Sequence, residues 1–138
     1  MMPQEFSVGA VIYNGNEFLL VKYIPGHWGL VKGKCESGEK KEDTLRRELF
    51  EETGIKGVYI AKDFSVSEKY FVKRKVGTVY KEVEYLLGEV QEKEVKLSKE
   101  HLDFKWLGFQ EAMSLITFKS TKNVFKEAHD YLKLHGGF

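Results

Sequence analysis

The chain of 138 residues is long enough to bury one hydrophobic core, so we expect a single domain over residues 1–138. Hydrophobic residues make up 42% of the sequence and aromatic residues 14%, which excludes a disordered chain. The formal net charge of +1 provides no overall field for a nucleic acid or a membrane surface, so binding to either is not expected. A polyanion would have to bind at a local cluster of charges.

Three features concern the compartment. The longest apolar run, Val8–Tyr13, is far shorter than the roughly 20 residues of a membrane-spanning helix. The N-terminal stretch MMPQEFSV lacks the basic and apolar regions of a signal peptide. The single cysteine, Cys35, excludes an internal disulfide framework and fits a reducing environment. We therefore predict a cytoplasmic protein.

The first part of the chain predicts a β-hairpin followed by a loop. Residues 5–13 and 16–23 are rich in β-branched and aromatic residues, and the turn signal Asn14-Gly15-Asn16 joins them. Glycines at positions 26, 29 and 33 follow, and they predict a loop interrupted by a very short strand. A helix is predicted next, over residues 40–53, because Leu45 and Leu49 form an apolar i, i+4 pair and Gly54 can cap its end.

The second half of the chain predicts more strands. Residues 56–72 and 76–90 read as extended segments that pair across the basic turn Lys73-Arg74-Lys75, and residues 104–109 read as another short strand.

The last predicted element is a helix, which Ser120 or Thr121 is placed to N-cap. One apolar face of this helix is formed by Val124, Phe125, Ala128 and Leu132. The order of strands and helices predicts an α/β fold, in which a mixed β-sheet is sandwiched between α-helices.

The helix over residues 40–53 carries three acids on one face. Glu48, Glu51 and Glu52 are spaced i, i+3 and i+4. Like charges at this spacing repel by roughly 0.2–0.5 kcal/mol per pair, so a compensating ligand is expected. Carboxylate oxygens are the ligands that Mg²⁺ prefers. The face therefore predicts a site for Mg²⁺, for which Mn²⁺ can substitute.

The same region resembles a known motif. Gly33 is followed after five residues by Glu39, and after seven more by Arg47–Ile55 (RELFEETGI). This pattern is similar to the Nudix box, G-x5-E-x7-R-E-U-x-E-E-x-G-U, in which U is a bulky aliphatic residue, and every defined position is filled. The alternative is an ordinary solvated acidic face, which does not account for the glycines and the arginine. The resemblance implies a Nudix fold and hydrolysis of a nucleoside diphosphate linked to another group.

The rest of the chain resembles one branch of this family. Residues 27–39 (HWGLVKGKCESGE) are similar to the H-W-x-x-P-K-G-H-x-E-x-G-E segment of asymmetrical diadenosine tetraphosphate hydrolases. Val31 stands in place of the usual proline, and Lys34 in place of a histidine. The similarity continues through residues 81–90, 97–115 and 118–132, so that it covers most of the chain.

The resemblance implies roles for individual residues. The catalytic residues would be Glu39, Arg47, Glu48, Glu51, Glu52 and Glu100. Metal ligands would be the carbonyl of Gly33 and the carboxylates of Glu48, Glu51, Glu52 and Glu100. Arg47 would pair with acids that include Glu39, and thereby brace the loop against the helix. An exposed loop acid is the alternative reading of Glu100.

Substrate binding is expected at a second set of residues. His27, Lys32, Lys81 and His101 would contact the phosphate chain, while Tyr85 and Phe118 would sandwich an adenine. Base stacking on aromatic rings contributes roughly 1–3 kcal/mol. The alternatives are a solvated loop position for His101 and core packing for the two aromatic residues.

The implied function is metal-dependent hydrolysis of diadenosine tetraphosphate to ATP and AMP, with a small-molecule nucleotide as substrate and no protein partner. Two other functions stay open. One is a Nudix pyrophosphohydrolase acting on nucleoside triphosphates or capped RNA 5′ ends, and the other is a nucleotide sensor without turnover. The identity of the general base, Glu48 or Glu100, stays open as well.

Overall fold

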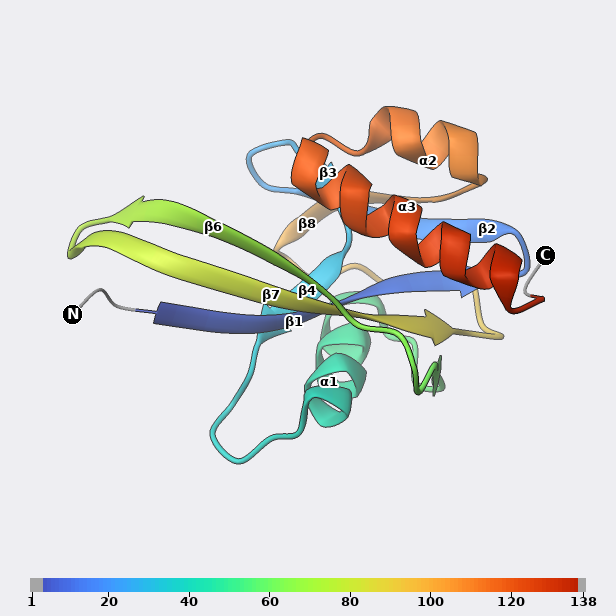
Figure 1. Ribbon diagram of the computed structural model, residues 1–138, viewed down its shortest axis with the longest axis horizontal. Coiled ribbons are helices and arrows are strands. Elements are labelled where there is room, and N and C mark those ends of the chain that lie inside the picture. Colours follow the sequence, from blue (N-terminus) through green and yellow to red (C-terminus); the bar gives the residue numbers. More distant parts are fainter. Residues whose placement is uncertain (1–3, 137–138) are drawn as a thin grey trace.

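The sheet is built around the first strand, β1 (Gln4–Asn14), in the computed structural model, which describes residues 4–136 (Figure 1). Residues 1–3, the start of the N-terminal stretch considered above, and 137–138 lie outside the described residues. β2 (Glu17–Tyr23) forms the predicted hairpin with β1. β4 (Val31–Lys34) pairs antiparallel with the same strand, and β7 (Gly77–Glu89) pairs parallel with it.

The remaining strands extend the sheet on both sides. β3 (Trp28–Gly29) and β8 (His101–Leu107) pair antiparallel with β2. β5 (Tyr59–Ile60) and β6 (Val66–Arg74) pair antiparallel with β7. The mixed sheet that the sequence predicts is therefore confirmed.

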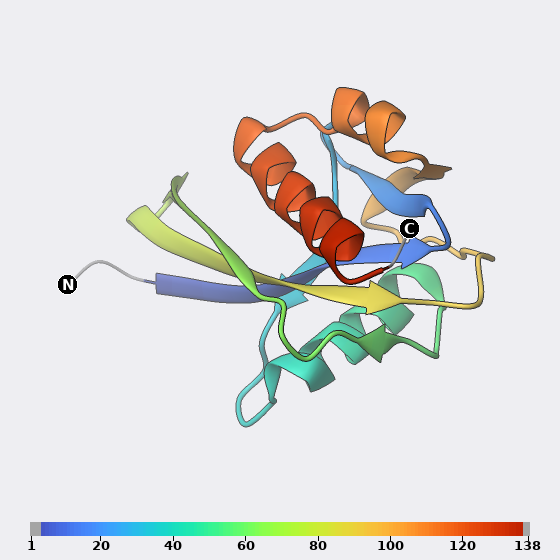
Figure 2. The same cartoon turned by 45° about the vertical axis from the view of Figure 1, so that its right-hand side comes forward.

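Helices cover both faces of the sheet, as Figures 1 and 2 show. α1 (Lys41–Thr53) lies on one face, while α2 (Phe109–Leu115) and α3 (Lys119–Leu134) lie on the other. Alternating side chains of the central strands supply the two cores. Val11, Val83 and Tyr85 belong to the core that includes Phe125 of α3, and Ala10 and Leu86 belong to the core that includes Leu45 and Leu49 of α1. No helix in the described part of the chain is long and apolar enough to span a bilayer.

The structure differs from the prediction in how the middle strands are divided. Residues 56–72 are not one extended segment, because the short β5 is separated from β6 by a loop at 61–65. The turn between β6 and β7 is shifted: Arg74 pairs with Gly77, so residues 75 and 76 form it rather than residues 73–75. Residues 104–109 do not form one strand, since β8 ends at Leu107 and α2 begins at Phe109.

The start of α3 also differs from the prediction. Phe118 occupies the N-cap position, and no side chain there bonds the first turn. Ser120 and Thr121 lie inside the first turn, so the prediction that one of them is the N-cap is wrong. Their hydroxyl groups instead donate hydrogen bonds to Glu68 of β6.

Candidate active site

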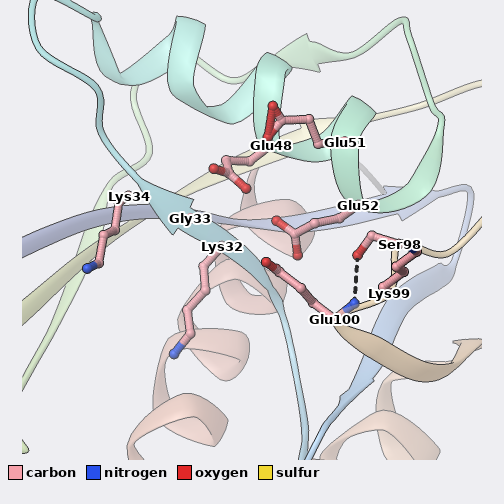
Figure 3. Close-up of a pocket in the computed structure, with 9 residues that line it drawn as sticks. All are labelled: Lys32, Gly33, Lys34, Glu48, Glu51, Glu52, Ser98, Lys99 and Glu100. Atoms are coloured by element: carbon pink, nitrogen blue, oxygen red, sulfur yellow. Dashed lines mark hydrogen bonds between the residues drawn. The ribbon is translucent and has the colours of Figure 1, made fainter.

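A cavity of about 630 Å³ opens beside α1, β4 and the segment that precedes β8 (Figure 3). All five residues predicted as metal ligands line it, which confirms that the chain brings them together. The lining residues are Lys32, Gly33, Lys34, Glu48, Glu51, Glu52, Ser98, Lys99 and Glu100.

The segment before β8 is attached to the C-terminal end of α1. The last carbonyl groups of a helix have no partner within the helix. Two of them accept hydrogen bonds here: Lys96 N–H donates to Thr53 O at 2.8 Å, and Ser98 N–H donates to Glu52 O at 3.2 Å. This attachment places Glu100 opposite Glu52, and Figure 3 shows the two carboxylates pointing toward one another.

Gly33 allows Glu48 to reach the cavity. A Cβ atom at position 33 would lie 1.9 Å from Glu48 Cδ and 2.2–2.3 Å from both carboxylate oxygens. No side chain fits at that distance, so the carboxylate occupies the space that a side chain at position 33 would need. Glycine is therefore required at this motif position because the side chain of Glu48 approaches β4 closely there.

Arg47 holds the acidic residues in place, and its predicted pairing with Glu39 is confirmed. Its Nε and Nη2 donate to the two carboxylate oxygens of Glu39 at 2.7 and 2.9 Å. Nη1 donates to Glu48 at 2.8 Å and to Glu51 at 3.1 Å, and Nη2 also donates to Lys34 O at 2.9 Å. One guanidinium thus connects the loop, β4 and α1.

This contact stabilises the charged form of Glu39. The hydrogen bonds from Arg47, followed by one from the backbone N–H of Glu36, lower the Glu39 pKa from 4.5 to about 2. Fork-shaped pairs of a guanidinium and a carboxylate combine charge with fixed geometry. Arg47 and Glu39 therefore act on the loop and on Glu48 as supports.

Glu52 is in an unusual environment for a carboxylate. Its side chain is buried, at 2% exposure. Burial, together with the nearby acids Glu48 and Glu100, raises its pKa from 4.5 to about 9. Neither of its carboxylate oxygens has a partner in good hydrogen-bond geometry, although Glu48 and the backbone of Lys32 are close enough to affect its pKa. A buried polar group without a partner is costly, so these oxygens fit the role of ligands to a cation.

The chemistry of the cavity fits a divalent metal ion. It combines unpartnered buried oxygens with two further carboxylates, Glu48 and Glu100, and all are hard oxygen donors of the kind that Mg²⁺ and Mn²⁺ bind. Within residues 4–136, no three acidic, histidine or cysteine side chains are close enough as they stand to enclose one ion. Ligand oxygens would therefore move together around a bound ion, or waters and phosphate oxygens would complete its shell.

The structure contradicts the phosphate contact predicted for His101. Its side chain is fully buried, at 0% exposure, so a substrate has no access to the ring. Nε2 lies 3.1 Å from Glu52 Oε1 without hydrogen-bond geometry, and Nδ1 lies 3.2 Å from Ser98 Oγ. Burial lowers the pKa of His101. The residue lies behind Glu52 and belongs to its support.

Four predicted substrate-binding residues line one small cavity of about 20 Å³, which shares Lys32 with the large cavity. They are His27, Lys32, Tyr85 and Phe118. The His27 ring is stacked on the Tyr23 ring with 4.8 Å between the ring centroids, and its centroid lies 5.0 Å from that of Phe118. Burial lowers the pKa of Lys32, which also lines the large cavity. Lys32 therefore links the acidic part of the site to an aromatic part.

The structure also contradicts the predicted stacking role of Tyr85. Tyr85 borders the small cavity together with Phe118, but its ring belongs to the core and is only 1% exposed, so a base cannot lie on its face. Phe118, in contrast, is 51% exposed.

The residue that sequence reasoning missed is Tyr70 of β6. It is partly exposed, and Lys32 Nζ donates to its hydroxyl at 3.3 Å. Its register partner on β7 is Lys81, whose Nζ lies 6.0 Å from the ring centroid. Tyr70 is thus the aromatic ring that lies between the two predicted phosphate-binding lysines.

Comparison with known proteins identifies the protein family. The NUDIX domain family model matches residues 3–128, and the chain belongs to the Nudix family. It is 38% identical over 122 residues to the asymmetrical bis(5′-nucleosyl)-tetraphosphatase of Mus musculus, which covers 84% of this chain and 80% of that protein. A shorter similarity, 43% identity over 61 residues, relates 40% of the chain to 43% of the nucleoside triphosphatase NudI of Escherichia fergusonii.

Solved structures show the same relation. The fold superposes on a binary complex of the C. elegans Ap4A hydrolase with a TM-score of 0.82 and 27% sequence identity, over 97% of this chain and 99% of that one. A MutT protein from Methanosarcina mazei superposes with a TM-score of 0.73 and 26% identity, over 96% and 97% of the two chains. The Nudix fold predicted from the sequence is therefore confirmed.

Proposed function

We propose that this protein hydrolyses dinucleoside polyphosphates with a divalent metal ion, and that it cuts diadenosine tetraphosphate to ATP and AMP. The observation that carries the proposal is the buried carboxylate of Glu52, which has no partner in good hydrogen-bond geometry and shares one cavity with Glu48 and Glu100. The 38% identity to the mouse asymmetrical bis(5′-nucleosyl)-tetraphosphatase supports the choice of substrate.

A bound Mg²⁺, or Mn²⁺ in its place, would be held by the carbonyl of Gly33 and by the carboxylates of Glu48, Glu51, Glu52 and Glu100. A bound divalent ion neutralises charge on a phosphate chain and helps to activate a water molecule. The arrangement of the protein supports this assignment, because all five residues line the same cavity.

The chain's own residues would prepare the attack. Arg47 orients the Glu48 carboxylate through a hydrogen bond of 2.8 Å. Either Glu48 or Glu100 would accept a proton from the water that attacks a phosphorus next to a nucleoside. The bond from that phosphorus to the bridging oxygen breaks, so that the water oxygen stays on AMP and ATP leaves with the bridging oxygen.

Binding of the substrate would involve the lysines and the exposed rings. Lys32 and Lys81 would interact with the negative charge of the phosphate chain, on either side of Tyr70. Tyr70 and Phe118 would hold an adenine, and Tyr70 takes the place that the sequence assigned to Tyr85. Their exposure supports this exchange, because a base needs a ring face that is open to solvent.

The whole chain, residues 1–138, would form one domain, which the match of the family model to residues 3–128 supports. The protein would work in the cytoplasm, where its single cysteine, Cys35, remains reduced.

The test is a product analysis on a panel of substrates. The wild-type protein is incubated with diadenosine tetraphosphate, ATP, GTP and a 5′-capped RNA, with Mg²⁺ or with an excess of chelator. Equal amounts of ATP and AMP from the first substrate, and none with chelator, are expected. Reaction in ¹⁸O-labelled water should place the label on AMP.

Other outcomes would replace the proposal. Two molecules of ADP as products would mean symmetrical cleavage. Rapid cleavage of ATP, GTP or the RNA cap, with diadenosine tetraphosphate intact, would indicate a Nudix pyrophosphohydrolase that acts on nucleoside triphosphates or capped RNA. Nucleotide binding without turnover would indicate a sensor.

A further inference from the structure

Glu68 is a buried acid that has no part in the scheme above. It lies on β6 and is 6% exposed. Three hydroxyl groups surround its carboxylate: Ser120 Oγ donates at 2.5 Å, Thr121 Oγ1 at 3.1 Å and Tyr85 Oη at 3.3 Å. A buried carboxylate requires such partners to offset its desolvation. The set is therefore a built connection and not an accidental contact.

The hydrogen bonds of Glu68 connect β6 to the first turn of α3. Ser120 and Thr121 both lie in that turn, which follows directly after Phe118. The N-terminal end of a helix favours a negative charge, which adds to the strength of this connection. Through the helix start, the position of Phe118 relative to β6 depends on Glu68.

The same carboxylate is close to Tyr70 along the chain. Residues two apart on a strand point to the same face, so the side chains of Glu68 and Tyr70 share the face of β6 that α3 covers. Phe118 is also attached on its other side, because Trp28 N–H donates to Thr117 Oγ1 at 2.8 Å and Thr117 N–H donates to Trp28 O at 3.1 Å. Phe118 thus lies between two attachments.

We propose that Glu68 is a positioning residue that sets the separation between the rings of Tyr70 and Phe118 and thereby the affinity of the site for a planar base. The inference rests on the proposed function in one respect, because it takes a nucleotide to be the ligand. Glu68 does not touch the base, and it acts through the strand and the helix start.

The chain offers a matched control in Glu84 of β7. This acid also accepts hydrogen bonds from a hydroxyl and a charged side chain, Ser65 Oγ at 2.6 Å and Lys41 Nζ at 2.8 Å. It pairs in register with Ser67, next to Glu68, but faces α1 on the opposite side of the sheet. Replacing Glu84 removes a more exposed set of hydrogen bonds at a neighbouring position of the sheet and leaves the base site untouched.

The experiment compares two ligands that differ only in the base and contain no bond that the enzyme can cut. Dissociation constants for AMP and for ribose 5-phosphate are measured by NMR titration on wild type, Glu68→Gln, Glu68→Ala and Glu84→Ala. We expect wild type to bind AMP more tightly by roughly five- to a hundred-fold. Glu68→Ala should lose most of this preference while its affinity for ribose 5-phosphate stays unchanged.

The remaining variants separate positioning from general stability. Glu68→Gln keeps an acceptor oxygen and should keep most of the preference, and Glu84→Ala should keep all of it even where its Tm falls. With diadenosine tetraphosphate, Glu68→Ala should raise KM and leave kcat unchanged. If Glu68→Ala does not fold, the double variant Ser120→Ala/Thr121→Val is used in its place. It removes two of the hydroxyl groups that donate to Glu68 and leaves Glu68 itself unchanged.

Three results would overturn the inference: an unchanged preference for AMP in Glu68→Ala, an equal loss of affinity for ribose 5-phosphate, or an equal loss of preference in Glu84→Ala. A wild-type protein that does not distinguish the two ligands would overturn it as well. Failure to cleave diadenosine tetraphosphate, with the preference for AMP intact, would instead refute the proposed function alone.

Discussion

Replacing Gly33 by alanine tests whether the carboxylate of Glu48 must lie against β4. The new Cβ would be 1.9 Å from Glu48 Cδ, and ordinary contact begins at 3.4 Å, so the carboxyl group has to retreat by about 1.5 Å. The backbone of Gly33 is not among those with positive φ, so alanine fits the strand itself. The change therefore acts on the position of one side chain.

The size of the effect follows from this displacement. A misplacement of about 1 Å in a catalytic group can lower the rate on the order of a hundred-fold. We expect kcat for diadenosine tetraphosphate to fall by about that factor in Gly33→Ala. Stability should change little, because Glu48 loses one partly exposed ion pair with Arg47, and such pairs contribute about 1 kcal/mol or less.

Kinetics and thermal unfolding on the same samples provide the assay. Gly57→Ala is the matched control, because a Cβ there meets no atom within 4 Å, and both its kcat and its Tm should stay near those of wild type. A Gly33→Ala enzyme with normal kcat would refute the reasoning that Glu48 works from this place. A large fall in Tm would show that the clash is absorbed by the backbone.

Three further predictions concern other parts of the site. Glu52→Gln should lose most metal-dependent turnover and keep the Tm of the metal-free protein, because a neutral amide replaces a carboxyl group whose pKa is about 9; a Tm lower by many degrees would contradict this. Tyr70→Leu and Phe118→Leu should each raise KM by roughly five- to a hundred-fold with kcat unchanged, and a normal KM would remove them from the base site. Hydrogen bonds led by those from Arg47 lower the pKa of Glu39 from 4.5 to about 2. Wild type should therefore be more stable than Glu39→Gln above pH 4.5, and this difference should vanish as the pH falls toward 2. Urea unfolding across this pH range measures the difference.

Sequence patterns located the acidic helix and its surroundings well. The sequence predicts this helix over residues 40–53, and the structure has it over Lys41–Thr53. Gly54 caps it with a φ of 78°, as the left-handed position requires. The hairpin at Asn14-Gly15-Asn16 is present as well. These elements depend on local rules, namely apolar spacing, a terminal glycine and a turn signal, and local rules can be read without the rest of the fold.

The base-binding side of the site could not be predicted as well, because it depends on strand register. A turn centred on Arg74 would pair Tyr70 with Thr78, whereas the observed turn pairs it with Lys81. A shift of this kind changes which side chains share a face. Tyr85 looked equally suitable by alternation along its strand, and only the packing of α3 over it shows that it is core. The burial of His101 behind Glu52 likewise depends on the docking of residues 96–100 onto α1.

The pairing of β1 with β7 has a consequence for how the molecule forms. β7 is made well after β1 during synthesis, yet it pairs parallel with β1 from Gln4 to Tyr13. The side chain of Asn14 also donates to Val90 O, 76 residues further along the chain. Contacts of such long separation slow folding, because a large loop must close before they form. An emerging chain therefore holds its hairpin and its acidic helix without the strand that completes both cores. Until β7 leaves the ribosome, the apolar faces of β1 and α1 remain open to chaperones and to other chains.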